Sequence, residues 1–254
     1  MFNILKASFF RYFRSKLFIA TIILLVVLPI FTTGLQYLLQ HLINDQLGEL
    51  GGGTFVISAV ALFLMALTLV SDFGMVFVIF AVVILVDDFN HNTIRNPIIA
   101  GYPKLKQFFA TLILILSISV VSLAINAIST YIYAGLMFGF YGVDWVGQAW
   151  ATIIYLLASA VTLTFAVFIV YWLKNTAFSI LIVVGSLFAL SMSTAVLVMS
   201  ESEVVINILM FIAPVGLIND LNAGQIVGII LTQLFLAAGF IGLGAYISHT
   251  KDYK

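Results

Sequence analysis

The sequence predicts an all-α polytopic membrane protein with six transmembrane helices. Of its 254 residues, 63% are hydrophobic and only 8% are charged, whereas soluble domains carry about 25% charged residues. So few charges cannot cover a water-facing surface, which excludes an ordinary globular protein. The apolar stretches are long enough to cross a bilayer, and the basic residues are confined to every second connection between them.

Six apolar stretches each reach the roughly 20 residues that a helix needs to span about 30 Å of hydrocarbon. They cover residues 17–39, 55–86, 108–133, 149–173, 177–199 and 226–247, which form a single transmembrane domain over 1–254.

A seventh apolar stretch, 204–213, is too short to span and is followed by Pro214. We interpret 201–222 as a re-entrant or interfacial hairpin between spans five and six. An apolar connecting loop without any membrane role is the alternative.

The basic residues predict the orientation of these spans. With six spans, all ten Lys and Arg residues fall on one side of the membrane and the connections on the other side hold none. Lys and Arg concentrate in cytoplasmic segments, so both termini are predicted to be cytoplasmic. The ten residues are Lys6, Arg11, Arg14, Lys16, Arg95, Lys104, Lys106, Lys174, Lys251 and Lys254.

The first 16 residues predict an amphipathic helix that lies in the inner interface of the bilayer. At 100° per residue, Arg11 and Arg14 lie opposite an apolar face. Such a helix acts as a topological anchor or as a docking surface for a cytoplasmic partner. The apolar face consists of Phe2, Leu5, Phe9, Tyr12 and Phe13.

Two polar residues inside predicted spans have functional and structural interpretations. Asp72 is the only charged residue deep inside a span, and an intramembrane carboxylate lines a cavity or relays protons in many transporters. However, 55–86 is too long for a plain span, so Ser71 and Asp72 could instead cap a helix after a broken outer segment. Asn126 either contributes to a translocation path with Asp72 or forms a hydrogen bond between helices.

Several kinds of chemistry have no motif in this sequence. The three histidines lie in separate connections without metal-ligand spacing, and there is no cysteine. A nucleophile elbow and a Gly-x-x-x-x-Gly-Lys-Ser/Thr phosphate loop are also missing, so the chain by itself is not expected to be an enzyme. Glycines at 224, 228, 239, 242 and 244 allow close approach of the last span to its neighbours.

The connection 87–106 differs from a plain loop. Ile94 and Ile98 are four residues apart and would share one face of a short helix, with Ile99 beside them. An exposed apolar patch with a polar rim is typical of a protein contact.

This connection resembles the inner loop of the ABC-2 family of ATP-binding-cassette transporter permeases, which carries an acidic residue, Gly-Thr-Ile-Arg, a Gly and a basic residue. Asn92 stands in place of the first Gly and Asp88 in place of the usual Glu; Asn tolerates a left-handed backbone. The six-span layout, the N-terminal helix and the hairpin are similar to that family over the whole chain. The matching positions are Asp88, Thr93, Ile94, Arg95, Gly101 and Lys104.

The resemblance implies the membrane subunit of an ABC exporter in a bacterial cytoplasmic membrane. Two permease copies would pair with two copies of a separate ATP-binding subunit, which would bind ATP and Mg; no cofactor is expected on this chain and no nucleic acid among its partners. The loop residues expected to couple to that subunit are Asp87, Asp88, Thr93, Ile94, Arg95, Asn96, Ile98, Gly101 and Lys104.

The chain looks most like compact permeases that export or confer immunity to amphipathic peptides, such as staphylococcal toxin peptides and lantibiotics. An exporter of small drugs or ions from the same family is the nearer alternative. A secondary transporter coupled to protons through Asp72, or a membrane scaffold that transports nothing, is the alternative from another class.

Overall fold

The computed structural model describes residues 2–49, 57–67, 72–91, 93–140, 145–198 and 223–250, and every regular element in these ranges is an α-helix. The predicted hairpin at 201–222 lies outside the described residues. The helices are α1 (Phe2–Phe13), α2 (Lys16–Glu49), α3 (Ala59–Ala66), α4 (Asp72–Asn90), α5 (Arg95–Ile99), α6 (Lys104–Phe138), α7 (Trp145–Leu173), α8 (Thr176–Val198) and α10 (Ala223–Thr250).

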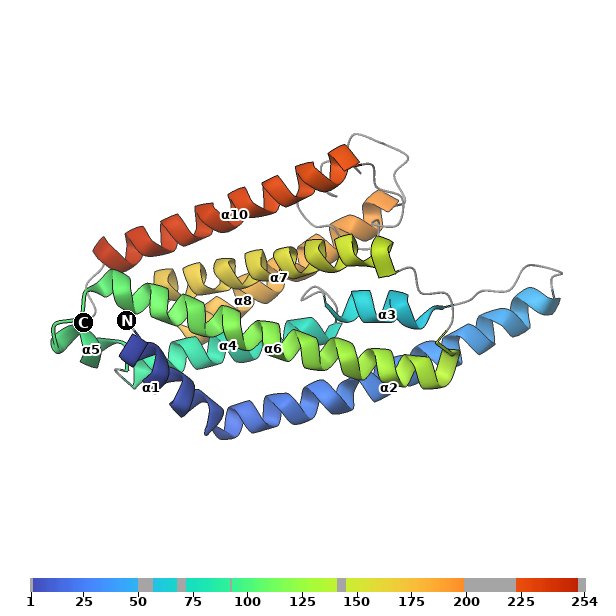
Figure 1. The fold of residues 1–254 in the computed structure, drawn as a ribbon, viewed down its shortest axis with the longest axis horizontal. Helices are drawn as coiled ribbons and strands as arrows, with labels where there is room; N and C mark the ends of the chain where they lie inside the picture. Colours follow the sequence, from blue (N-terminus) through green and yellow to red (C-terminus); the bar gives the residue numbers. More distant parts are fainter. Residues whose placement is uncertain are drawn as a thin grey trace.

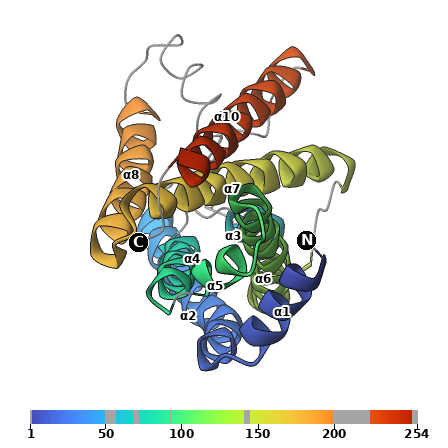
Figure 2. The same cartoon turned by 90° about the vertical axis from the view of Figure 1, so that its left-hand side faces the viewer.

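Four described helices are long and apolar enough to cross a membrane, which suggests a membrane protein. They comprise Lys16–Gln46 in α2, Lys104–Phe138 in α6, Ala149–Leu173 in α7 and Ala223–Thr250 in α10. The long helices extend lengthwise along the molecule as a bundle (Figure 1), and α7, α8 and α10 are tilted against one another (Figure 2). α6 is central to the packing, because it contacts α1, α2, α3, α5, α7 and α10.

The main core lies between α4, α6, α7 and α8. Val78 and Val82 of α4 are fully buried there, as are Val167 of α7 and Val183 of α8. Aromatic rings continue this core toward the end of α4: Tyr171 of α7 packs edge-to-face on Phe89 and on Phe108, with ring centroids 5.0 and 5.1 Å apart. These contacts fix α4, α6 and α7 to one another.

The stretch 55–86 contains two helices, α3 and α4, and α4 begins at Asp72. One continuous span is therefore wrong, and the alternative of a helix that follows a broken outer segment agrees with the structure. Side chains from two other helices satisfy backbone carbonyls at the end of α3. Asn126 Nδ2 of α6 donates to the Ala66 carbonyl at 2.9 Å, and Ser159 Oγ of α7 donates to the Leu67 carbonyl at 2.8 Å. A helix can end inside an apolar bundle only where such partners replace its missing backbone bonds.

Two helices extend beyond the spans predicted within them. α2 continues ten residues past the predicted end at 39, and α6 begins at Lys104 and ends at Phe138 instead of covering 108–133. With 35 residues, α6 is about 52 Å long at 1.5 Å per residue, well above the thickness of the hydrocarbon core. Both helices are therefore longer than the apolar segments that hydropathy predicts within them.

All described Lys and Arg residues lie in segments at one end of the bundle, which we call the basic end. These segments are α1 with the start of α2, α5, the start of α6 and the turn between α7 and α8 (Figure 1). Figure 2 looks onto this end and shows α1 and α5 in front of the bundle. The described basic residues are Lys6, Arg11, Arg14, Lys16, Arg95, Lys104, Lys106 and Lys174; Lys251 and Lys254 lie outside the described ranges.

Candidate functional site

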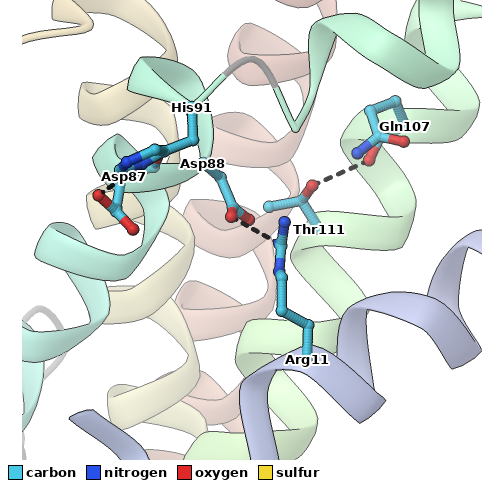
Figure 3. A network of polar contacts seen from close by, with 6 residues as sticks. All are labelled: Arg11, Asp87, Asp88, His91, Gln107 and Thr111. Carbon is cyan, nitrogen blue, oxygen red and sulfur yellow. Dashed lines mark hydrogen bonds and ion pairs between the residues drawn. The ribbon is translucent and has the colours of Figure 1, made fainter. Parts of the chain in front are cut away.

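An ion pair joins α1 to the end of α4 at the basic end. Arg11 Nη2 in the last turn of α1 lies 2.6 Å from Asp88 Oδ1 in the last turn of α4 (Figure 3). The Asp88 side chain is 14% exposed and that of Arg11 is 44% exposed. The contact joins residues 77 positions apart in the sequence, so it ties two separate segments together.

Packing of α1 on the bundle brings Arg11 to this position. Tyr12 is buried, and Leu5 and Phe9 pack against the main core. Phe13, which the sequence places on the same apolar face, is exposed. After α1 the chain turns sharply, and Ser15 Oγ accepts a hydrogen bond from the Phe18 amide at the start of α2.

The remaining predicted residues of the N-terminal helix have different surroundings. Arg14 follows α1 and is exposed, with its guanidinium carbon 4.3 Å from the centre of the Phe10 ring. Phe2 is the first residue of α1, and its side chain is not among those that the structure describes. Arg11 and Arg14 therefore differ: one contacts the bundle and the other faces outward.

The carboxyl group of Asp88 is only partly compensated by Arg11. Burial raises the pKa of Asp88 to about 6, Arg11 acts in the opposite direction, Asp87 raises the pKa further and His91 lowers it. At neutral pH the group is ionised at an energetic cost. A second positive charge beside the Asp88 carboxylate would lower the free energy of its ionised form.

The backbone of Asp88 also organises the turn that leads into α5. Its carbonyl accepts hydrogen bonds from the Thr93 amide at 3.0 Å and the Ile94 amide at 3.3 Å. Asp87 Oδ1 lies 2.9 Å from His91 Nδ1, but both side chains are more than half exposed, so this contact contributes little to stability. Asp88 thus contacts α1 through its side chain and the α5 turn through its backbone.

The short helix α5 is anchored by Ile94. This side chain is 1% exposed and belongs to the main core, Ile98 is partly buried against it, and Ile99 is 71% exposed. The prediction that Ile94, Ile98 and Ile99 form one exposed patch is therefore wrong. Ile94 fills the core under α5, and of the three only Ile99 faces outward.

Pro97 and Gly101 set the length of α5. Pro97 lies in the first turn, where a helix makes no use of the missing N–H group. At the other end, the Gly101 amide donates to the Ile98 carbonyl and the Tyr102 amide to the Pro97 carbonyl, both at 3.0 Å. Gly101 has φ of +90°, so these bonds form a Schellman motif that favours glycine. α6 then begins at Lys104, after Pro103.

A cavity of about 380 Å³ opens between α1, α5 and the start of α6. A smaller one of about 100 Å³ shares Ser8 and Arg11 with it and is also bordered by Asp87 and Asp88. The sequence prediction included Arg11, Thr93 and Asn96 among the residues around the larger cavity and missed the other polar ones. Those are Ser8, Tyr102 and Gln107, which carry no local motif that could have identified them.

The structure brings only some of the predicted residues together. Asp88, Thr93, Ile94, Asn96 and Arg11 meet around α5; the same segment contains Asp87, Ile98, Gly101, Lys104 and Arg95, whose side chain is not among those described. Asp72 begins α4, at the opposite end of that helix from Asp88, and its side chain is likewise not described.

The buried Asn126 bonds to α3. This contact gives Asn126 a structural role, and its place on a translocation path stays a prediction. Among the described residues, no group of three His, Asp or Glu residues could hold a metal ion. At the basic end, α1, α4 and α5 are therefore connected by an ion pair, by backbone hydrogen bonds and by the packing of Ile94.

Comparisons with protein-family models, with curated proteins and with solved structures find no match to this chain.

Proposed function

We propose that the chain is the membrane-spanning permease subunit of an ABC-2 type exporter, driven by a separate ATP-binding subunit that docks on the basic end. The observation that carries the proposal is the attachment of α5. This short helix protrudes at the end of the bundle, yet it is fixed to the core through Ile94 and to the end of α4 through the Asp88 carbonyl. The Asp88 side chain in turn pairs with Arg11 of α1.

Six spans fit the observed helices. The four long apolar helices α2, α6, α7 and α10 account for four of them. α4 and α8 have 19 and 23 residues, about 28 and 34 Å, which is close to the thickness of the hydrocarbon core. With α1 in the interface and the basic end in the cytoplasm, this count agrees with the positive-inside rule.

Because α5 is attached to α4 and to the core, a partner that displaces α5 would also move the membrane helices. Asp88 at the end of α4 holds the Thr93 and Ile94 amides, and Ile94 lies in the core formed with α6 and α7. A partner that pressed on the exposed Ile99 would therefore displace α4 and α6 together and would not merely bend a loop. Movement of packed helices between discrete arrangements is a common form of switching.

The electrostatics of Asp88 also favour a partner. Its raised pKa shows that Arg11 does not fully compensate the buried carboxylate. A cationic side chain of an ATP-binding subunit near the α4–α5 turn would lower the free energy of the ionised form.

The class of substrate follows from the resemblance and the composition. An amphipathic peptide or another hydrophobic substrate fits helices that are apolar on most sides, and two copies of the chain would enclose its path. Export of small drugs or ions is the alternative within the same family, and proton coupling through Asp72 is the alternative outside it.

A test of docking uses the exposed Ile99 and a matched control. Leu42 is 61% exposed on α2, toward the other end of that helix from the basic start of the chain. Ile99→Asp should abolish co-purification of an ATP-binding-cassette ATPase and ATP-dependent export, while Leu42→Asp leaves both intact. If Ile99→Asp retains both, α5 is not the docking element.

Sidedness has a separate test, because the chain contains no cysteine. Asn96→Cys on α5 should react with an impermeant thiol reagent only from the cytoplasm, and Gln46→Cys near the end of α2 only from outside. The reverse pattern would overturn the orientation and with it the proposed function.

A further inference from the structure

We propose that α1 is a pH-sensitive latch, which lies on the end of α4 while Asp88 is protonated and detaches more readily once Asp88 is ionised. The latch consists of a short helix at the start of the chain, a turn about which this helix can swing, and a carboxyl group that the helix covers. It is a property of this chain alone and does not depend on the proposed function.

α1 packs incompletely against the bundle. Its attachment consists of the buried Tyr12, of two partly buried hydrophobic side chains and of the ion pair between Arg11 and Asp88. Two cavities, of about 380 and 100 Å³, border α1, and Ser8 and Arg11 line both of them. Protein interiors are normally close-packed, and elements with few buried contacts open locally. A 12-residue helix beside two cavities is therefore suited to detach without unfolding of the bundle.

The turn between α1 and α2 allows such a movement. Only Arg14 and Ser15 separate the two helices. Ser15 Oγ accepts a hydrogen bond from the Phe18 amide and the Ser15 carbonyl accepts one from the Ile19 amide, so the first turn of α2 is capped without any residue of α1. A backbone bond from the Ser15 amide to the Tyr12 carbonyl connects the turn to α1. α1 can therefore swing about this turn while the start of α2 stays intact.

α1 covers the carboxyl group of Asp88. The smaller cavity borders Asp88, and Ser8, Arg11 and Tyr12 of α1 line it together with Ser15 of the turn. The lining residues that come from α2 and α6 are leucines, which offer a carboxylate no hydrogen bond. Detachment of α1 would therefore replace one wall of this cavity with water.

The titratable and charged groups beside Asp88 come from two elements. On α1, Arg11 is the cation, and Tyr12 is neutral because burial raises its pKa to about 12. At the end of α4, Asp87 and His91 lie together and face away from Arg11 (Figure 3). The residues of α2 and α6 that line the cavity carry no charge.

The balance of these effects sets the direction of the pH response. Burial raises the pKa of Asp88 from 3.8 to about 6, although Arg11 lowers it. Contact with water would return the pKa toward its ordinary value, so docked α1 holds a proton that detached α1 releases. Docking is therefore favoured at acidic pH, and this preference is lost as the pH rises through about 6. The ratio of docked to detached α1 should be about tenfold higher at pH 5.0 than at pH 7.5, because pH 5.0 lies one unit below that pKa.

The position of α1 also affects α5. α1 forms one wall of the larger cavity, and α5 and the start of α6 form the others. Detachment of α1 would open this cavity, so the pH would control access to the side of α5 that carries Thr93 and Asn96.

The test measures the distance between α1 and the bundle by double electron–electron resonance on the full-length protein in detergent. Because the chain contains no cysteine, spin labels can be attached at Lys6→Cys on α1 and Val120→Cys on α6, both at exposed positions. We expect one short distance to dominate at pH 5.0 and a longer, broader component to grow at pH 7.5. Asp88→Asn is uncharged like the protonated carboxyl group and should keep α1 docked at both pH values.

Three controls isolate the latch. Asp87→Asn and His91→Gln remove the neighbouring titratable groups and should retain the pH response. A second label pair, Val120→Cys with Leu243→Cys on α10, reports on the bundle and should give the same distance at both pH values.

Several results would overturn the latch. One is an unchanged distance between α1 and α6 at the two pH values, and another is a longer component that grows at acidic pH, since the attraction to Arg11 would then dominate. A response that persists in Asp88→Asn would assign it to another group. A response that also changes the distance between α6 and α10 would show that the whole bundle loosens.

Discussion

Replacing Asp88 with asparagine should stabilise the protein at neutral pH, although it removes an ion pair. Burial raises the pKa of Asp88 from 3.8 to about 6. Each pKa unit corresponds to about 1.4 kcal/mol, so ionisation of the buried group costs about 3 kcal/mol at neutral pH. The raised pKa already includes the attraction to Arg11. Because asparagine leaves the Arg11 guanidinium without its carboxylate partner, we expect a net gain of about 1–2 kcal/mol.

Removing the partner should have the opposite effect. Arg11→Gln leaves a carboxylate that is 14% exposed without a cation, and we expect a loss of about 1–2 kcal/mol because Arg11 itself is nearly half exposed. For a chain of this size, 1 kcal/mol shifts the melting temperature by about 2–4 °C. Thermal unfolding in detergent, followed by tryptophan fluorescence, resolves such shifts.

The pH dependence distinguishes this explanation from a simple loss of contacts. Since the folded-state pKa is above the unfolded value, the folded chain keeps a proton that the unfolded chain releases between about pH 4 and 6. The contribution of Asp88 to stability is therefore present at acidic pH and is lost as the pH rises through about 6. Asp88→Asn should lack this loss, so its advantage should be large at pH 7.5 and small at pH 4.5.

A lower melting temperature for Asp88→Asn at pH 7.5, similar to that of Arg11→Gln, would refute the reasoning. The pair would then be a net stabilising ion pair and the pKa of Asp88 would not be raised. If Asp88→Asn is more stable but docks its ATP-binding subunit poorly, the carboxylate is retained at a cost to stability because it is needed for function.

Three further predictions concern backbone and packing, each measured as thermal unfolding in detergent. Gly244→Ala should lower the stability of the protein by about 1–3 kcal/mol, because the new Cβ would lie 2.8 Å from the buried Phe108 ring. The control Gly242→Ala should have no such effect, since its Cβ meets nothing within 4 Å. Equal effects of the two substitutions would contradict the packing of α10 on Phe108. Gly101→Ala should cost about 1 kcal/mol through its φ of +90° alone, as nothing lies near its Cβ, and an unchanged melting temperature would argue against the Schellman turn. Asn126→Leu should cost about 1 kcal/mol by leaving the Ala66 carbonyl unsatisfied; an unchanged melting temperature would show that this bond does not hold the break after α3.

The sequence predicted the helical class and the site segment, but not how the site is built. Ile94 and Ile98 indicated a short helix in the inner connection, and α5 is that helix. Spacing alone could not show that Ile94 points into the core, because that depends on the room left between α4, α6 and α7. The same limit applies to the glycines of the last span, where Gly244 approaches a neighbour closely and Gly242 does not.

The sequence by itself determined that this chain is helical and suited to a membrane. The length of its apolar stretches and the positions of Lys and Arg between them are properties of the linear sequence. Tertiary structure decided which polar groups meet. Arg11 and Asp88 are 77 residues apart and Asn126 and Ala66 are 60 apart, so no local pattern pairs them. Such contacts form only after helices have packed, because the packed interior fixes which charge or carbonyl lacks water and therefore needs a partner.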